Sequence, residues 1–125
     1  MSARVLVVDD NEDSLRIVES ILRSAGFEVC VARDGKQGLE IAEASVPELI
    51  ILDIMMPVMD GVEALHRLRD SPRTSRIPVI LLTAKTQDED VIAGYQTGAD
   101  YYMTKPFTAK QLLYGVRLVL GQTDS

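Results

Sequence analysis

The stretch Leu49-Ile50-Ile51-Leu52-Asp53 is an unbroken apolar run that ends in a carboxylate. Two other runs are equally continuous and rich in β-branched residues, Val5-Leu6-Val7-Val8 and Val79-Ile80-Leu81-Leu82. Strands without polar alternation are typical of parallel sheets whose two faces are covered by helices. Two segments of more mixed composition, Glu28–Ala32 and Tyr101–Thr104, are expected to form the edge strands of the same sheet.

Segments with helical periodicity lie between these strands. Apolar spacing, caps and breakers predict helices over residues 14–24, 36–44, 62–70, 88–98 and 108–120. Five βα units in regular alternation predict a doubly wound α/β fold, flavodoxin-like, with a parallel sheet of strand order 2-1-3-4-5. We expect residues 1–120 to form one domain and residues 121–125 to be a flexible tail or linker stump.

The composition is that of a folded globular domain. Of the 125 residues, 46% are hydrophobic and 26% are charged, and the net charge is −6. This acidity argues against binding of nucleic acid or an anionic membrane by the domain alone. The sequence shows neither a membrane-spanning run nor a signal peptide, and it has a single cysteine, Cys30, which we expect in the core. These features together predict a cytoplasmic protein.

Polar side chains stand at the carboxyl ends of four predicted strands. Asp9 and Asp10 follow the first strand, Asp53 ends the third, and Thr83 and Lys105 follow the fourth and fifth. Ligands of such sheets bind outside the carboxyl ends of the strands, so we expect these side chains to line one cleft. Carboxylates at strand ends also cap helices, but clustered carboxylates require a counter-charge, and oxygen ligands beside water suit Mg²⁺.

Other chemistry-bearing residues form no recognisable site. His66 is the only histidine and has neither a second histidine nor a nearby cysteine to complete a zinc set, so we expect it on the surface. The methionines near residues 55–59 are interpreted as packing for a loop. The glycines do not have the spacing of a nucleotide-binding loop.

The chain resembles the receiver domains of bacterial two-component response regulators over essentially its whole length. The matching segments are Val7-Val8-Asp9-Asp10-Asn11, Leu52-Asp53-Ile54-Met55-Met56-Pro57, Asp60-Gly61, Leu82-Thr83-Ala84, Gly98-Ala99-Asp100, Tyr102 and Lys105-Pro106-Phe107. Each segment alone is a weak signal, whereas their combination in this order is specific.

This resemblance implies a phosphoacceptor and a magnesium site. Asp53 would accept a phosphoryl group from a phosphohistidine on a sensor histidine kinase or a histidine phosphotransfer protein. Asp10, Asp53 and the backbone carbonyl of Met55 would bind Mg²⁺ directly, and Asp9 would act through water. Lys105 would pair with an oxygen of the phosphoryl group.

The resemblance also implies a switch. Thr83 would bind a phosphoryl oxygen after transfer, and Tyr102 would turn inward as Thr83 moves. The peptide bond between Lys105 and Pro106 is expected to be cis. The output surface would be the face of the fourth helix, fifth strand and fifth helix, where Tyr95, Tyr102, Tyr114 and Leu118 are expected to form an apolar patch for a partner or a second copy.

Two alternative functions compete with a switch that catalyses only its own phosphorylation and dephosphorylation. A hydrolase of the haloacid dehalogenase type would have a second aspartate two residues after its nucleophile, where this chain has Met55, and would usually need a cap domain. A degenerate receiver would act only as a protein-interaction module, but the five polar residues at the strand ends are intact.

Overall fold

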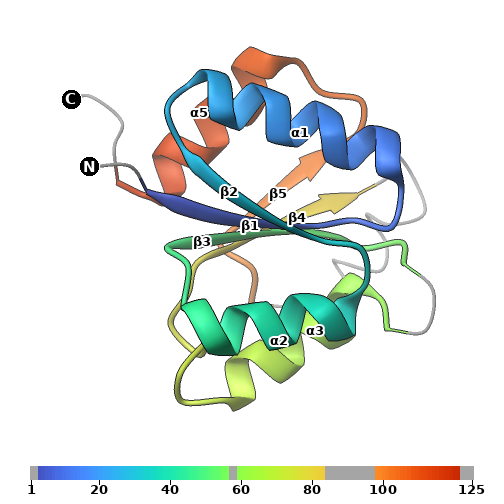
Figure 1. Ribbon diagram of the computed structural model, residues 1–125, viewed down its shortest axis with the longest axis vertical. Helices are drawn as coiled ribbons and strands as arrows, with labels where there is room; N and C mark the ends of the chain where they lie inside the picture. Colours follow the sequence, from blue (N-terminus) through green and yellow to red (C-terminus); the bar gives the residue numbers. More distant parts are fainter. Residues whose placement is uncertain (1–2, 57–58, 84–97, 122–125) are drawn as a thin grey trace.

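A computed structural model describes residues 3–56, 59–83 and 98–121 (Figure 1). Its elements in chain order are β1 (Arg4–Val8), α1 (Glu12–Ser24), β2 (Glu28–Ala32), α2 (Gly35–Ser45), β3 (Leu49–Asp53), α3 (Gly61–Asp70), β4 (Val79–Thr83), β5 (Tyr101–Thr104) and α5 (Ala109–Val119). The helix predicted over residues 88–98 falls almost entirely outside the described residues.

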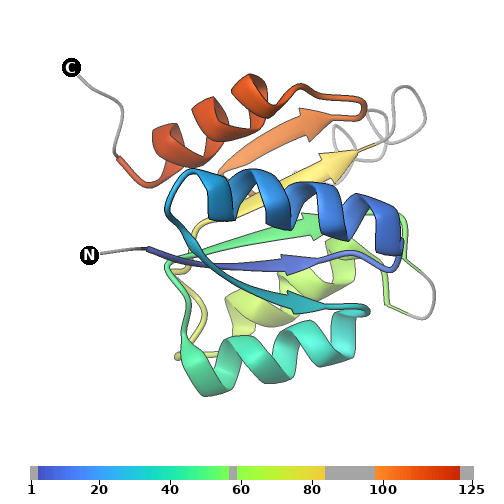
Figure 2. The ribbon, with the colours of Figure 1, turned by 45° about the horizontal axis from the view of Figure 1, so that its top comes forward.

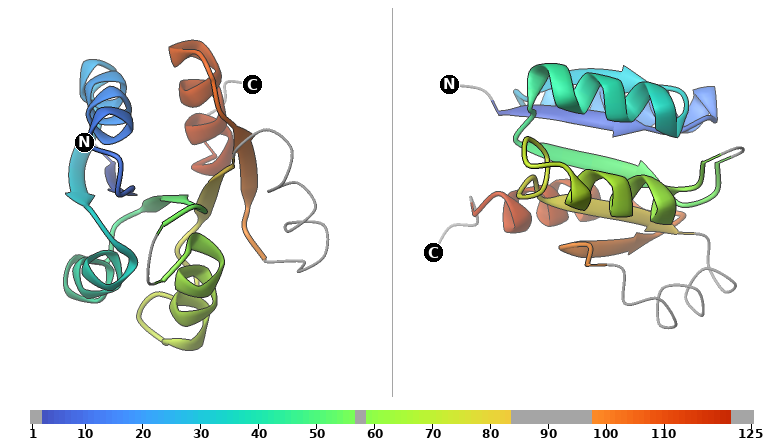
Figure 3. Two further views of the ribbon diagram at one scale, coloured as in Figure 1. Left: turned by 90° about the vertical axis from the view of Figure 1, so that its right-hand side faces the viewer. Right: turned by 90° about the horizontal axis from the view of Figure 1, so that it is seen from below.

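The five strands form one parallel sheet of order β2-β1-β3-β4-β5, as predicted. All strands point the same way, so their carboxyl ends lie along one side of the molecule (Figure 2). Helices α1 and α5 cover one face, and α2 and α3 cover the other (Figure 3). The doubly wound, flavodoxin-like α/β fold is therefore confirmed.

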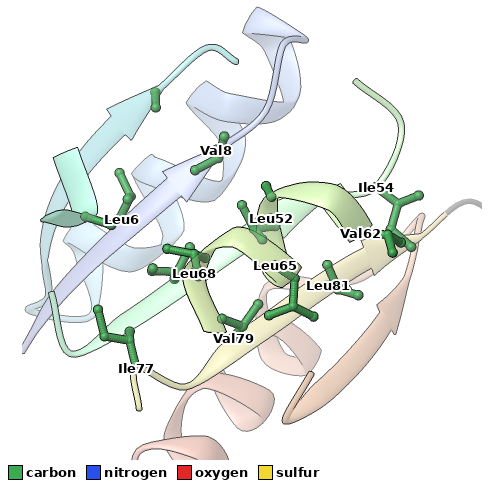
Figure 4. Close-up of a cluster of buried hydrophobic side chains, with 14 of the residues drawn as sticks. Leu6, Val8, Leu52, Ile54, Val62, Leu65, Leu68, Ile77, Val79 and Leu81 are labelled. Carbon is green, nitrogen blue, oxygen red and sulfur yellow. The ribbon is translucent and has the colours of Figure 1, made fainter. Parts of the chain in front are cut away.

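The hydrophobic core consists of two clusters separated by the sheet. Successive strand residues point to opposite faces, so Leu6 and Val8 pack toward α2 and α3, whereas Val5 and Val7 pack toward α1 and α5. Figure 4 shows the first cluster around Leu65 of α3. Each fully buried leucine contributes about 2 kcal/mol to stability. Because helices cover both faces of the sheet, side chains that point either way are buried, and the central strands therefore read as continuous apolar runs.

Each described helix begins at a capping side chain. The cap accepts a hydrogen bond from the backbone N–H three residues later: Asn11 from Ser14, Asp34 from Gln37, Asp60 from Glu63, and Thr108 from Gln111. Three of the helices extend one or two residues further toward the N-terminus than predicted, because caps satisfy N–H groups in the first turn. In the described part of the chain, no helix has the length and hydrophobicity needed to cross a bilayer.

Strand β2 corrects one expectation, because Cys30 is exposed rather than in the core. The strand lies at the edge of the sheet, and its burial is uneven along one face. Ala32 is fully buried, whereas Cys30, two residues earlier on the same face, is open to solvent. An apolar segment at a sheet edge therefore does not specify which of its residues a helix covers.

Candidate functional site

The structure brings the three predicted carboxylates together at the carboxyl ends of β1 and β3. Asp9 is completely buried, Asp53 is 5% exposed, and Asp10 is open to solvent. Each residue offers one oxygen, and the three oxygens lie within 4.8 Å of one another. This arrangement follows from the pairing of β1 with β3, which places the ends of the two strands side by side.

Lys105, directly after β5, supplies the positive charge among these carboxylates. Its Nζ lies 3.4 Å from Asp9 Oδ2 and 3.5 Å from Asp53 Oδ2. Its backbone N–H donates to the carbonyl of Thr83 over 2.7 Å, and its peptide bond to Pro106 is cis. One lysine beside three ionised carboxylates leaves two negative charges in excess.

Backbone groups orient the two buried carboxylates. Asp9 Oδ1 accepts a hydrogen bond of 2.9 Å from the N–H of Asn11, and Asp53 Oδ1 lies 3.4 Å from the N–H of Met55. The Met55 side chain is itself largely exposed, two residues after Asp53. These contacts keep the second oxygen of each carboxylate directed toward Lys105.

Gly61 is a structural residue of the site to which the sequence reasoning gave no role. Its N–H donates to the carbonyl of Ile54, and a Cβ at this position would lie 2.5 Å from the carbonyl oxygen of Asp53. Only glycine allows the first turn of α3 to approach the end of β3 so closely. The signal in the sequence for this close approach was the pair Asp60-Gly61, a helix cap followed directly by glycine.

The environment of Asp53 raises the pKa of its carboxyl group to about 7. Burial is the largest cause, followed by the negative charge of Asp9, while the Lys105 ammonium acts in the opposite direction. Without a further cation, this carboxyl group therefore carries a proton in a large fraction of molecules at neutral pH. A cation that binds the carboxylate would displace that proton.

Thr83 is the last residue of β4, next to the end of β3 that carries Asp53, and its hydroxyl makes no hydrogen bond to the described residues. The side chain is 1% exposed, and its Oγ1 has no hydrogen-bond partner within the described residues. A buried polar atom without a partner is uncommon and points to a ligand or an ion. On neighbouring β5, Tyr102 is partly exposed at 39% and pairs in register with Leu81.

The donor set fits a hard divalent cation. All three side chains offer oxygen, two negative charges are in excess once all three are ionised, and Asp10 leaves one side open to water. Mg²⁺ prefers oxygen ligands and keeps several of its waters. The set contains neither sulfur nor imidazole, the ligands that favour zinc.

Comparison with known proteins places these features in one family. The family model for the response regulator receiver domain matches residues 5–117. The DNA-binding dual master transcriptional regulator RpaA of Synechocystis sp. is 43% identical over 121 residues, which are 97% of this chain and 50% of RpaA. The chain thus spans about half the length of this curated relative.

Solved structures show the same similarity. The chemotaxis protein CheY4 of Vibrio cholerae is 34% identical, with a TM-score of 0.87 over 95% of this chain and 99% of CheY4. The receiver domain of the sensor histidine kinase PA1611 from Pseudomonas aeruginosa is 31% identical, with a TM-score of 0.89 over 97% of this chain and 99% of that domain. That domain holds a magnesium ion in its active-site cleft. With a family model matched over most of its length and the acidic site in place, this chain belongs to the response regulator receiver domain family.

Proposed function

We propose that the chain is a phosphorylation-controlled switch of a two-component phosphorelay, with Asp53 as the phosphoacceptor. The observation that carries this proposal is the nearly buried Asp53 carboxylate, which has Lys105 on one oxygen and two other carboxylates within metal-binding distance. Receiver domains generally work with histidine kinases, so the proposed donor is a phosphohistidine on a sensor kinase or a histidine phosphotransfer protein. The proposed compartment is the cytoplasm.

The proposed magnesium ligands are Asp10, Asp53 and the backbone carbonyl of Met55, with Asp9 acting through water. The three clustered side-chain oxygens and their excess negative charge support this assignment. When bound, Mg²⁺ supplies positive charge to the oxygens of the transferring phosphoryl group. Asp53 would then be ionised, because its proton and the metal compete for the same carboxylate.

Each proposed role in the transfer suits the chemistry of its side chain. The ionised Asp53 carboxylate attacks phosphorus without a general base, so an O–P bond forms as the N–P bond to the donor histidine breaks. The imidazole leaves with the electron pair of that bond and takes up a proton. Lys105 neutralises a phosphoryl oxygen, and the unpartnered Thr83 hydroxyl donates to another. Both interactions are stronger in this poorly solvated site than in water, which makes the stabilisation effective.

The alternative to a phosphorylated switch is a receiver that gains no phosphoryl group and acts only as an interaction module. Intact-mass measurement after incubation with acetyl phosphate distinguishes these two functions. We expect wild type to gain one phosphoryl group in the presence of Mg²⁺ and none with chelator. Asp53→Asn should gain none, because the amide is not a nucleophile. Asp13→Asn, a change at an exposed position of α1, should gain one as wild type does. An equal gain in Asp53→Asn would exclude Asp53 as the acceptor.

The proposed output surface is the face of the fourth helix, β5 and α5. On its described part, Tyr114, Leu118 and Tyr102 are 57%, 40% and 39% exposed, while Leu112 and Val116 are fully buried. Tyr95, also expected here, lies outside the described residues. Phosphorylation would shift an equilibrium between two positions of Thr83 and Tyr102 and so change this face.

Light scattering tests whether the occupant of this face is a second copy. We expect the wild-type chain to dimerise when beryllofluoride and Mg²⁺ are added, and the Tyr114→Ala, Leu118→Glu double variant to remain a monomer. The Ile17→Ala variant, which changes an equally exposed apolar residue on α1, serves as the control and should dimerise. A wild type that stays monomeric would exclude the homodimer and favour a different partner.

A further inference from the structure

Arg69, near the end of α3, connects three parts of the chain. It lies where β4 and β5 begin, at the opposite end of these strands from the acidic site. Its guanidinium donates to the carbonyls of Ile77 and Ser75, over 2.7 and 3.3 Å, in the connection between α3 and β4. It also donates to the carbonyl of Gly98 over 3.3 Å and to Asp100 Oδ2 over 3.1 Å, just before β5. The planar fork of arginine can satisfy several acceptors at once, which the single ammonium of lysine cannot.

Asp100 joins this arrangement to the first residue of β4. Its Oδ2 accepts from the N–H of Val79 over 2.8 Å, and its own N–H donates to the carbonyl of Val79 over 2.9 Å. Gly98 has a φ of 82°, and nothing lies within 4 Å of the position of a Cβ, so backbone conformation rather than space favours glycine there. We call Arg69, Gly98 and Asp100 the Arg69 clamp. The clamp aligns the start of β5 with the start of β4.

Strand β5 depends on such a clamp because its own sequence specifies its register weakly. It is a four-residue edge strand that pairs with β4. Met103 is buried, Tyr101 is partly buried, and Tyr102 and Thr104 are exposed. Register is poorly defined where a strand buries few side chains, and a slip of one residue moves the strand about 3.3 Å and turns each side chain to the other face.

The register of β5 sets the position of Lys105. Thr104 pairs with Thr83 and Lys105 follows immediately, and in this register its Nζ lies 3.4 Å from Asp9 and 3.5 Å from Asp53. The three carboxylates, in contrast, stand at the ends of β1 and β3 and do not depend on β5. We infer that Arg69 and Asp100 are positioning residues that hold Lys105 in the phosphoacceptor site from the opposite end of β5.

The inference predicts a split between two ligands, and its first readout rests on the proposed function. Beryllofluoride, a phosphoryl analogue, should require Lys105, whereas Mg²⁺ alone should require the carboxylates. In titration calorimetry we expect Arg69→Met to weaken beryllofluoride binding at saturating Mg²⁺ by about tenfold or more, the effect of losing charge-assisted hydrogen bonds. The affinity for Mg²⁺ should not fall, because the carboxylates stay in place and displacement of Lys105 removes a competing positive charge.

Three further variants make the test specific. Arg73→Met is the matched control, because Arg73 lies in the same connection but binds Glu43 and not the start of β5. It should leave both affinities unchanged. Arg69→Lys keeps the charge without the fork and should recover less than half of the lost affinity. Asp100→Asn keeps an acceptor for Val79 and weakens the bond to Arg69, so it should lower beryllofluoride affinity even if Arg69→Met fails to fold.

Amide hydrogen exchange gives a readout that does not depend on phosphorylation. In Arg69→Met we expect the amides of β5 to exchange about tenfold faster than in wild type, with the amides of β1 unchanged. Unchanged β5 exchange would overturn the clamp, and so would Mg²⁺ and beryllofluoride affinities that fall by the same factor. If wild type binds no beryllofluoride, the proposed function fails, and the exchange rates alone then decide whether the clamp exists.

Discussion

Replacing Gly61 with alanine is expected to lower the free energy of unfolding by about 4 kcal/mol and to weaken Mg²⁺ binding with it. The new Cβ would lie 2.5 Å from the carbonyl oxygen of Asp53 and 2.9 Å from the Cα of Ile54. Both are backbone atoms, so relief requires the start of α3 or the end of β3 to move. Because Asp53 is the last residue of β3, either movement displaces it from its neighbouring carboxylates. Urea denaturation and titration calorimetry measure the two effects.

The matched control for this variant is Gly35→Ala. Gly35 is also the first residue of a helix after an aspartate cap, but its Cβ would meet the side chain of Met59 at 3.0 Å. The closest atoms, Met59 Sδ, Cβ and Cγ at 3.0–3.1 Å, need to move by only a few tenths of an ångström, so we expect a smaller loss of about 1 kcal/mol. Equal losses of stability in the two variants would show that the contact with Asp53 is not the cause.

The variant Asp53→Asn is expected to be more stable than wild type at pH 8 in the absence of divalent cations, by about 2 kcal/mol. Burial and Asp9 raise the pKa of Asp53 from 3.8 to about 7 in the folded chain. Between these values the unfolded chain releases a proton that the folded chain retains, so wild-type stability falls as pH rises through this window. Above pH 7 the full penalty persists, and the asparagine variant avoids it.

Thermal unfolding at two pH values tests this sign. The advantage of Asp53→Asn should shrink to under about 1 kcal/mol at pH 5, and saturating Mg²⁺ should reverse it by stabilising wild type. Lys105→Met should act in the opposite direction at pH 8, because it leaves Asp9 and Asp53 without their cation. The exposed Asp13→Asn serves as the control and should show no such pH dependence. An advantage that is equal at pH 5 and pH 8 would contradict the raised pKa.

The sequence predicted the sheet well because buried parallel strands have a strong local signature. The continuous runs at β1, β3 and β4 and the capping residues before the helices depend on neighbours in the chain. Cys30 was placed wrongly because the coverage of an edge strand depends on where a helix ends above it, which periodicity does not encode.

The site was predictable as a set of residues but not as an arrangement. Strand-end positions indicated which side chains meet, since parallel strands end on one side of a sheet. The sharing of Lys105 between Asp9 and Asp53, and the contact of Gly61 with the Asp53 carbonyl, arise only when the chain is folded. The same holds for Arg69, whose acceptors lie up to 31 positions away in sequence.

The imbalance of one lysine against three carboxylates also bears on ion selectivity. A potassium ion would leave one negative charge uncompensated beside the fully buried Asp9, whereas a single divalent ion would bring the site to neutrality. In a low-dielectric environment an uncompensated charge is costly. The side chains therefore favour divalent over monovalent ions through charge alone, before ionic radius or coordination number contributes, even where monovalent ions are in large excess.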